Sequence, residues 1–236
     1  MTRYGQPCPI ALASKILGER WTLLVLRELL AGSARFSDIQ RGVPKMSPTL
    51  LSRRLKALEE AGVVRRINGK GAPAAEYRLT DAGLELRLLV RFAGCWAQRW
   101  VRDRITREDL DPRYLMWDIR RLLRREKIPG GRAVIYVEFS GVPRRIGQWW
   151  LVATKAGVDL FALDPGRTAD VSLFLDVRSL TEVFLGITGW PELKAERRVK
   201  ITGSSPLIRT LPDWFSRSPF WDVEPGPAAA PRTPQP

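Results

Sequence analysis

The side chains best suited to chemistry in this chain are the basic and hydroxyl groups of residues 47–62, SPTLLSRRLKALEEAG. At 100° per residue, Leu51, Leu55 and Leu58 fall on one narrow stripe of a helix. The opposite side carries Thr49, Ser52, Arg53, Lys56 and Glu60. Hydroxyl and basic groups donate hydrogen bonds to phosphates and to base edges. The segment therefore predicts an amphipathic helix that is docked by its leucines and faces a polyanion.

The ends of this helix and the segment before it suggest a known arrangement. Ser47 is a good N-cap, and Pro48 stands at the first helical position, where its missing N–H costs nothing. The preceding FSDIQRGVPKM predicts a shorter helix with Ser37 as its N-cap, broken at Gly42 and Pro44. Two helices joined by a tight turn are the arrangement of a helix-turn-helix, whose second helix lies in the major groove of DNA.

A basic hairpin is expected directly after the helix. Residues 63–67 and 75–79 are candidate strands, and Arg65, Arg66 and Lys70 would lie on the turn between them, as a wing that reaches phosphates or the minor groove. A purely solvated basic face is the alternative interpretation. The candidate DNA-binding residues are Ser47, Thr49, Ser52, Arg53, Arg54, Lys56, Arg65, Arg66 and Lys70.

Composition narrows the choice of partner. The 236 residues carry a formal net charge of +14, of which residues 1–108 carry +10 and residues 109–236 carry +4. Nucleic acid is the commonest partner of such a chain, and anionic membrane is the second. No segment is apolar enough to span a membrane, no secretory signal is evident, and two cysteines are too few for a disulfide framework. We therefore expect a cytoplasmic protein.

The chain contains no histidine. This removes the usual general base, the Ser-His and Cys-His pairs, and most zinc, copper and non-haem iron sites. With only Cys8 and Cys95 as soft ligands, no metal site can be named. We expect neither catalytic activity nor a cofactor.

Periodicity divides the chain into two domains of an α+β protein. Residues 1–108 are mainly helical, with helices predicted over residues 10–17, 22–30, 37–41, 47–61 and 82–102. A helical connector over residues 109–132 would end at Pro129. Residues 133–224 are rich in strands, over 133–139, 148–154, 159–163, 171–177 and 196–203, with helices over 179–187 and 205–215. The proline-rich tail, residues 225–236, is expected to be disordered.

Two sets of apolar residues have structural interpretations in the helical half. Trp21, Leu24, Leu26 and Leu29 are expected to be core. Phe92, Trp96 and Trp100 recur at four-residue spacing on the last helix, and they predict either a dimer seam or packing on the second domain.

Several motifs in the right order resemble the HxlR-type bacterial transcription regulators, relatives of the MarR winged-helix proteins, over nearly all of residues 7–104. They are Cys8-Pro9, GERWT at 18–22, Arg35-Phe36 with Ile39, LSRRLK at 51–56, Glu59 to Gly62, and YRLT at 77–80 with Gly83. The resemblance implies a dimeric winged helix-turn-helix that binds a palindromic operator, with its first and last helices in the dimer contact.

Cys8 has two interpretations. Family members that sense oxidants or electrophiles use a cysteine at this position, so the resemblance implies a thiol switch. A helix start in a basic protein also favours a thiolate in general. Against this, a free cysteine near a helix start is most often plain packing.

Residues 133–224 resemble a sterol-carrier-protein-like domain, an α+β fold in which a sheet covers an apolar tunnel. The shared order is strand, helix with a Gly turn, strand ending in Gly, and closing helix. An apolar pocket would be lined by aromatic residues that could equally be ordinary core, namely Trp149, Trp150, Phe161, Phe174, Phe184 and Trp190.

The sequence thus predicts a homodimeric regulator, a repressor or autoregulator, that binds double-stranded DNA and responds to a hydrophobic effector or to thiol oxidation. The alternative is a lipid or acyl carrier whose basic half docks on anionic membrane. The recognition helix argues against that alternative, because membrane-surface helices present large apolar residues beside the basic ones.

Overall fold

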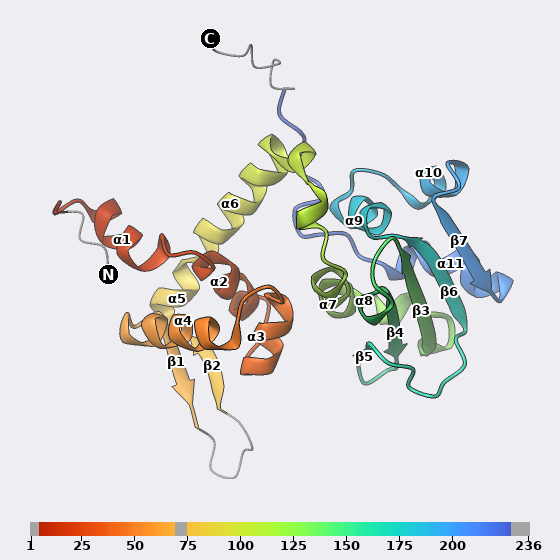
Figure 1. Cartoon of the computed structure of the whole chain (residues 1–236), viewed down its shortest axis with the longest axis horizontal. Coiled ribbons are helices and arrows are strands. Elements are labelled where there is room, and N and C mark those ends of the chain that lie inside the picture. Colours follow the sequence, from red (N-terminus) through yellow and green to blue (C-terminus); the bar gives the residue numbers. More distant parts are fainter. Residues whose placement is uncertain (1–4, 69–74, 228–236) are drawn as a thin grey trace. The chain divides into compact units, whose positions relative to one another are not determined.

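The computed structural model describes residues 5–68 and 75–227, which form a mixed helix and sheet fold in two compact units (Figure 1). The boundary lies between Gly94 and Cys95, inside a helix, whereas the sequence suggested a boundary at residue 108. Each unit has its own hydrophobic core. Within the described residues, no helix is both long and apolar enough to cross a membrane.

The N-terminal unit is built from short helices and one hairpin. Its elements are α1 (Pro9–Leu17), α2 (Thr22–Leu30), α3 (Phe36–Gly42), α4 (Pro48–Glu60), β1 (Val64–Ile67), β2 (Glu76–Leu79), α5 (Asp81–Glu85) and the start of α6 (Arg87–Trp100). The two strands are antiparallel, with Val64 opposite Leu79 and Ile67 opposite Glu76. The structure therefore confirms the predicted order of elements, in which a helix-turn-helix is followed by a hairpin.

Two predicted helix boundaries in this unit are wrong. The N-cap of α3 is Arg35 rather than Ser37, so the helix begins one residue before the expected cap. The single helix expected over residues 82–102 is two helices that separate at Leu86. The first of them, α5, is held against the hairpin by Gly83, where a Cβ would lie 2.2 Å from the carbonyl oxygen of Val63.

The core of the N-terminal unit joins α2, α3 and α4. It contains Val25, Leu26, Ile39, Leu51 and Leu55, all fully buried. Two residues expected in this core are not buried in it, although Trp21 packs against it. Leu24 is 40% exposed, because the buried stripe of α2 runs through Thr22, Val25, Leu26 and Leu29 and leaves position 24 outside it. Trp21 is only partly buried and precedes α2 in a left-handed conformation with φ 77°.

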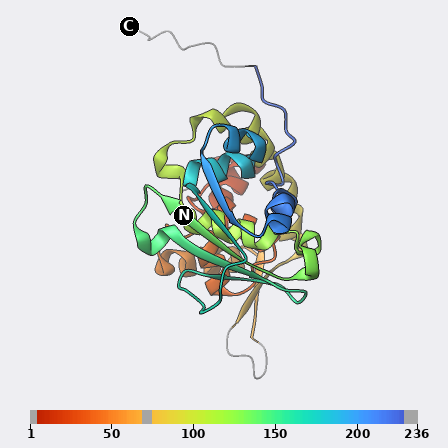
Figure 2. The same ribbon diagram turned by 90° about the vertical axis from the view of Figure 1, so that its right-hand side faces the viewer.

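The C-terminal unit is a five-stranded sheet with helices packed on one face (Figures 1 and 2). The strands are β3 (Ala133–Ser140), β4 (Gln148–Ala153), β5 (Val158–Phe161), β6 (Val171–Asp176) and β7 (Val199–Gly203), in the order β5-β4-β3-β6-β7. β3 and β6 are parallel, and the other pairs are antiparallel. The helices are α7 (Pro112–Leu122), α8 (Arg144–Gly147), α9 (Val177–Leu185), α10 (Trp190–Ala195) and α11 (Ser205–Trp214).

The segment expected to be a connector contributes to this second core. Leu115, Met116 and Ile119 of α7 are buried together with residues of the sheet, so α7 belongs to the C-terminal unit. The helix ends at Leu122, well before the expected end at Pro129. The physical reason is visible in the backbone, because the N–H of Arg124 donates to the carbonyl oxygen of Trp214 at 2.8 Å instead of continuing the helix.

Candidate nucleic-acid interface

The helix α4 is docked on the core of the N-terminal unit by its leucines. Leu51, Leu55 and Leu58 are buried, as their spacing predicts. The hydroxyl oxygen of Ser47 accepts a hydrogen bond from the N–H of Leu50 at 3.3 Å, and Pro48 occupies the first turn. The cap and the leucine stripe together fix which side of the helix faces outward.

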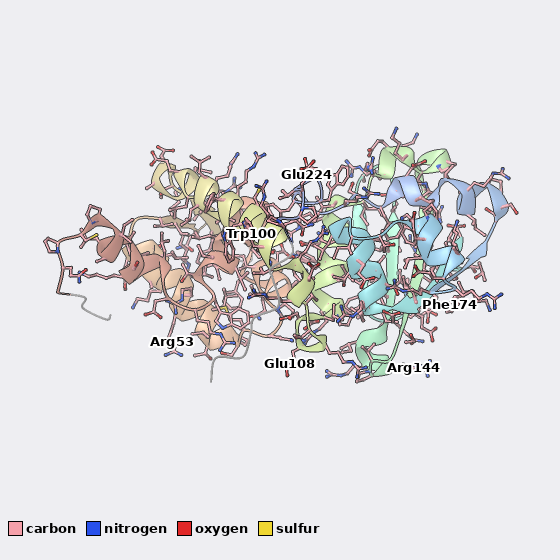
Figure 3. All side chains as sticks on the ribbon, turned by 90° about the horizontal axis from the view of Figure 1, so that it is seen from above. Arg53, Trp100, Glu108, Arg144, Phe174 and Glu224 are labelled. Atoms are coloured by element: carbon pink, nitrogen blue, oxygen red, sulfur yellow. The ribbon has the colours of Figure 1, made fainter. Side chains whose placement is uncertain are left out.

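The outward side of α4 carries polar and basic residues that remain exposed. These are Thr49, Ser52, Arg53 and Lys56. Lys56 lies 3.7 Å from Glu60 one turn later, a solvent-exposed pair that contributes little to stability and leaves the ammonium free to move. Arg53 points away from the ribbon of this unit in Figure 3. This face can therefore meet a polyanion without rearrangement of α4.

Arg54 has a different environment from its neighbour Arg53. Its side chain is only 14% exposed, and its Nη2 donates to Oε2 of Glu19 at 3.1 Å. Lys15, Ile16, Glu19 and Arg54 border a crevice of about 160 Å³ together with Ala57 and Leu58. Because Glu19 follows α1, the pair ties α4 to the α1–α2 turn, and the guanidinium of Arg54, a candidate DNA-binding group, does not share the exposed face of Arg53.

The turn between α3 and α4 is held by side chains that the sequence analysis did not single out. The amide Nε2 of Gln40 donates to the carbonyl oxygens of Met46 at 2.7 Å and of Val43 at 3.3 Å. These bonds close the turn that sets α4 relative to α3. The signal available in the sequence was weak, since a lone glutamine at a helix end has many ordinary roles.

The buried carboxylate of Glu28 packs against the end of α3, next to the same turn. Glu28 of α2 is fully buried and accepts hydrogen bonds from Nη2 of Arg27 at 2.9 Å and from the hydroxyl of Ser33 at 3.0 Å. Its carboxyl group packs on Gly42, where a Cβ would lie 1.9 Å from the carboxyl carbon. Nη2 of Arg27 also donates to the carbonyl oxygen of Gly42 at 2.8 Å. Glu28 and Arg27 thus position the end of α3.

Two of the three predicted wing residues lie in a strand and not on a turn. Arg65 and Arg66 lie within β1, and both are exposed. Successive residues of a strand point to opposite faces, so the two guanidinium groups leave the hairpin on different sides. Arg65 is opposite Arg78, which is paired with Glu76 at 2.8 Å, whereas Arg66 is opposite Tyr77. Lys70 lies outside the described residues.

Comparison with known proteins agrees with this arrangement of elements. The family model for the HxlR-like helix-turn-helix matches residues 16–105. The regulator YvaP of Bacillus subtilis is 42% identical over 99 residues, which are 41% of this chain and 92% of that protein. The chain belongs to the HxlR-like helix-turn-helix family.

Further relatives cover the same part of the chain. The HTH-type transcriptional regulator YodB of Bacillus subtilis is 33% identical over 95 residues, 39% of this chain and 85% of that protein. A crystal structure of PA1607, a putative transcription factor, has a TM-score of 0.39 at 31% identity, covering 41% of this chain and 68% of that one. Members of the HxlR-like family are transcription regulators rather than enzymes, and this chain is a DNA-binding transcription regulator.

The residues considered for sensing lie in contrasting environments. Cys8 is exposed and is the N-cap residue of α1. Of the six predicted pocket residues, Trp149, Phe184 and Trp190 are buried in the core, whereas Trp150 and Phe174 are half-buried and Phe161 is exposed. The six do not share one side of the sheet, because Trp149 and Trp150 are adjacent in β4 and point to opposite faces. They cannot all line a single cavity.

Proposed function

We propose that α4 is the recognition helix, and that its outward face reads operator DNA in the major groove. The observation that carries this proposal is the exposure of Thr49, Ser52, Arg53 and Lys56 opposite the buried leucine stripe. Arginine and lysine contact guanine edges or phosphates, and hydroxyl groups contact either. Arg65 and Arg66 on the hairpin add attraction to the phosphate backbone, which is independent of base sequence.

We further propose that the regulator acts as a homodimer on a palindromic operator. The support is a set of large apolar side chains that α1 and α6 leave in solvent: Ile10 and Leu12 of α1, and Leu88, Leu89, Phe92, Trp96 and Trp100 of α6. Leu88 is 76% and Phe92 is 68% exposed. A patch of this kind is typical of a protein interface, and a two-fold dimer calls for a two-fold operator.

The experiment that tests this function is footprinting of the purified protein on the DNA upstream of its own gene. A protected inverted repeat supports operator binding by a dimer, and it favours the role of repressor or autoregulator when it overlaps the promoter. Protection that lacks two-fold symmetry contradicts the dimeric arrangement. Absence of any protected region there contradicts autoregulation.

The C-terminal unit is proposed to act as a sterol-carrier-protein-like sensing domain for a hydrophobic ligand. Support comes from the order of its elements: β6 leads into α9, which ends at Gly186 with φ 72°, and β7 ends at Gly203 before the closing helix α11. A ligand site here would use only part of the predicted aromatic set, Trp149, Phe184 and Trp190, because these share the helical side of the sheet. Quenching of tryptophan emission by a bound fatty-acyl probe, together with a change in operator affinity, tests this role.

A thiol response at Cys8 is the second sensing proposal. The exposed position of the thiol at the start of α1 makes it accessible to diamide or quinones. We expect Cys8→Ser to bind operator normally in reducing buffer and to lose any response to these reagents. A wild-type protein whose operator binding ignores diamide and quinones overturns the proposal.

The lipid-carrier alternative is less well supported by α4. A helix that docks on a membrane surface places large apolar residues beside its basic ones. The exposed residues of α4 include Thr49, Ser52, Arg53 and Lys56, whereas its leucines at positions 51, 55 and 58 are buried. The outward face therefore fits DNA better than lipid.

A further inference from the structure

The sheet of the C-terminal unit has a second face that carries aromatic rather than polar residues. Along β3, β4 and β6, every second side chain is buried against the helices, and the intervening ones point to the other side, where Val134 and Val152 are buried as well. On an open face these are normally polar. Here they include Tyr136, Trp150, Phe161 and Phe174, which we call the aromatic face. Phe161 is 39% exposed, and the other three are half-buried.

The register of the strands joins these residues into one row. Phe161 of β5 is opposite Trp150 of β4, and Trp150 is opposite Tyr136 of β3. The ring centroids of Tyr136 and Trp150 are 4.9 Å apart, and those of Tyr136 and Phe174 are 6.1 Å apart. Phe174 is labelled in Figure 3. A continuous aromatic row across four strands is an apolar patch of the kind that marks an interaction site.

The polar groups of the face are arranged so that they tolerate burial. The hydroxyl of Tyr136 donates to Oε2 of Glu138 at 2.6 Å. Partial burial and this hydrogen bond raise the pKa of Tyr136 to about 12, so the hydroxyl remains a donor at neutral pH. The hydroxyl of Tyr136 keeps this hydrogen bond when the face is covered. An occupant could therefore cover the row without leaving these groups without partners.

The charges of the face argue against DNA and against anionic membrane as the occupant. The chain as a whole carries +14, yet the strands of this face present two acidic residues, Glu138 and Asp159, and one basic residue, Lys200, with no excess of positive charge. Lys200 is on β7 and Asp159 is on β5, the two outermost strands. Four inter-strand steps separate them by roughly 19 Å, so they cannot pair with each other within one chain.

We propose that the aromatic face packs against the same face of a second copy of this chain, about a two-fold axis that lies between the two sheets. Such an axis can bring the β7 edge of one copy opposite the β5 edge of the other. If the axis is perpendicular to the line from Asp159 to Lys200, which are also four residues apart in register along the strands, Lys200 of each copy meets Asp159 of its partner, which gives two equivalent ion pairs at the rim of an aromatic centre. A self-complementary patch with an apolar centre and a charged rim is what an isologous interface requires.

The charge pattern allows a test that is specific to this interface. It uses the full chain with Leu88→Glu and Phe92→Glu, two substitutions of exposed residues that remove the proposed α6 contact. Sedimentation velocity should show that this background protein still dimerises. Lys200→Glu or Asp159→Lys, added singly, should raise the dissociation constant of the dimer roughly tenfold, because each change places like charges opposite each other twice.

The decisive experiment mixes the Lys200→Glu variant with the Asp159→Lys variant. In the mixed dimer, the glutamate introduced at position 200 of one copy meets the lysine introduced at position 159 of the other, and the second contact keeps the native Lys200 and Asp159. Each impaired variant should therefore associate with the other about as strongly as the background protein associates with itself. Lys194→Glu on α10 and Asp213→Lys on α11 are matched controls, because both positions are exposed and lie away from the sheet face. They should leave dimerisation unchanged.

Other results would overturn the interface. A monomeric background protein contradicts it directly. So does a dimer whose dissociation constant is unaffected by the charge variants and by Trp150→Glu. Two impaired variants that do not associate when mixed exclude the two-fold pairing of Lys200 with Asp159. If instead the α6 contact is the incorrect one, Leu88→Glu and Phe92→Glu leave the dissociation constant of the wild-type protein unchanged, and the sheet variants still report on the aromatic face.

Discussion

At the residue scale, neighbouring side chains of α4 have distinct roles that sequence alone does not separate. Arg53 is exposed, whereas Arg54 is largely buried and paired with Glu19. Both arginines belong to the motif LSRRLK, and helical spacing places position 54 beside the leucine stripe without revealing that Glu19 lies within reach. The outward set, Thr49, Ser52, Arg53 and Lys56, could be predicted, because it depends only on the period of the helix.

We expect Arg54→Ala to lower the stability of the fold more than Arg53→Ala does. Arg54→Ala removes the ion pair with Glu19 and part of the packing beneath it, a loss of about 0.5–1.5 kcal/mol in the free energy of unfolding. Arg53→Ala removes an exposed side chain and should change the free energy of unfolding by less than about 0.5 kcal/mol. Urea unfolding of both variants measures the difference. Equal stabilities would contradict the different placement of the two arginines.

A second residue-scale prediction concerns Gly42. In an unobstructed helix, Gly→Ala stabilises by about 0.5–1 kcal/mol. Here the added Cβ would collide with the carboxyl group of buried Glu28, so we expect Gly42→Ala to destabilise the protein by about 1–3 kcal/mol. Ser37→Ala, at an exposed position of the same helix, is the control and should be nearly neutral. A stabilised Gly42→Ala protein would show that Glu28 does not pack there.

At the element scale, regular patterns predict elements well and distant contacts decide where they end. The helix predicted over residues 22–30 is α2, and the strands of the second half lie close to their predicted ranges, because periods of 3.6 and 2 residues are local properties. The end of α7 depends on a hydrogen bond from Arg124 to Trp214, a residue far along the chain, which no local pattern contains. The opposite directions of Trp149 and Trp150 were available from the period of a strand.

The hairpin gives an element-scale prediction about DNA binding. Arg65 and Arg66 leave β1 on opposite faces, so one of them lies nearer the duplex than the other in any single docking geometry. We expect Arg65→Gln and Arg66→Gln each to weaken binding to operator and to random duplex by the same factor. The two variants should differ in the size of that factor, and the variant with the larger loss of affinity should also show the smaller dependence of binding on salt. Titrations of both variants against operator and random duplex measure this. Loss of specific binding alone contradicts a role on phosphates.

At the scale of the whole molecule, α6 spans the boundary between the units. Its residues up to Gly94 belong to the N-terminal unit, and the following residues belong to the C-terminal unit, where Nε2 of Gln98 donates to the carbonyl oxygen of Leu185 at 2.9 Å. The helix-turn-helix, the hairpin and all of α6 lie within residues 1–108. We therefore expect a truncated protein of residues 1–108 to bind operator. A fatty-acyl probe should change the operator affinity of the full chain several-fold and should leave the operator affinity of the truncated protein unchanged. A truncation that responds to the probe contradicts sensing by the C-terminal unit.

The measurement that tests the central account most directly is operator affinity of the α4 variants. Arg53→Ala and Lys56→Ala should each weaken operator binding, by about 1–3 kcal/mol where the side chain contacts a base and by less, with a reduced salt slope, where it contacts a phosphate. Lys194→Ala on α10 is the matched control and should bind as the wild type does. If both α4 variants keep the affinity and the salt slope of the wild type, the outward face of α4 does not contact DNA, and the assignment of the recognition helix is wrong.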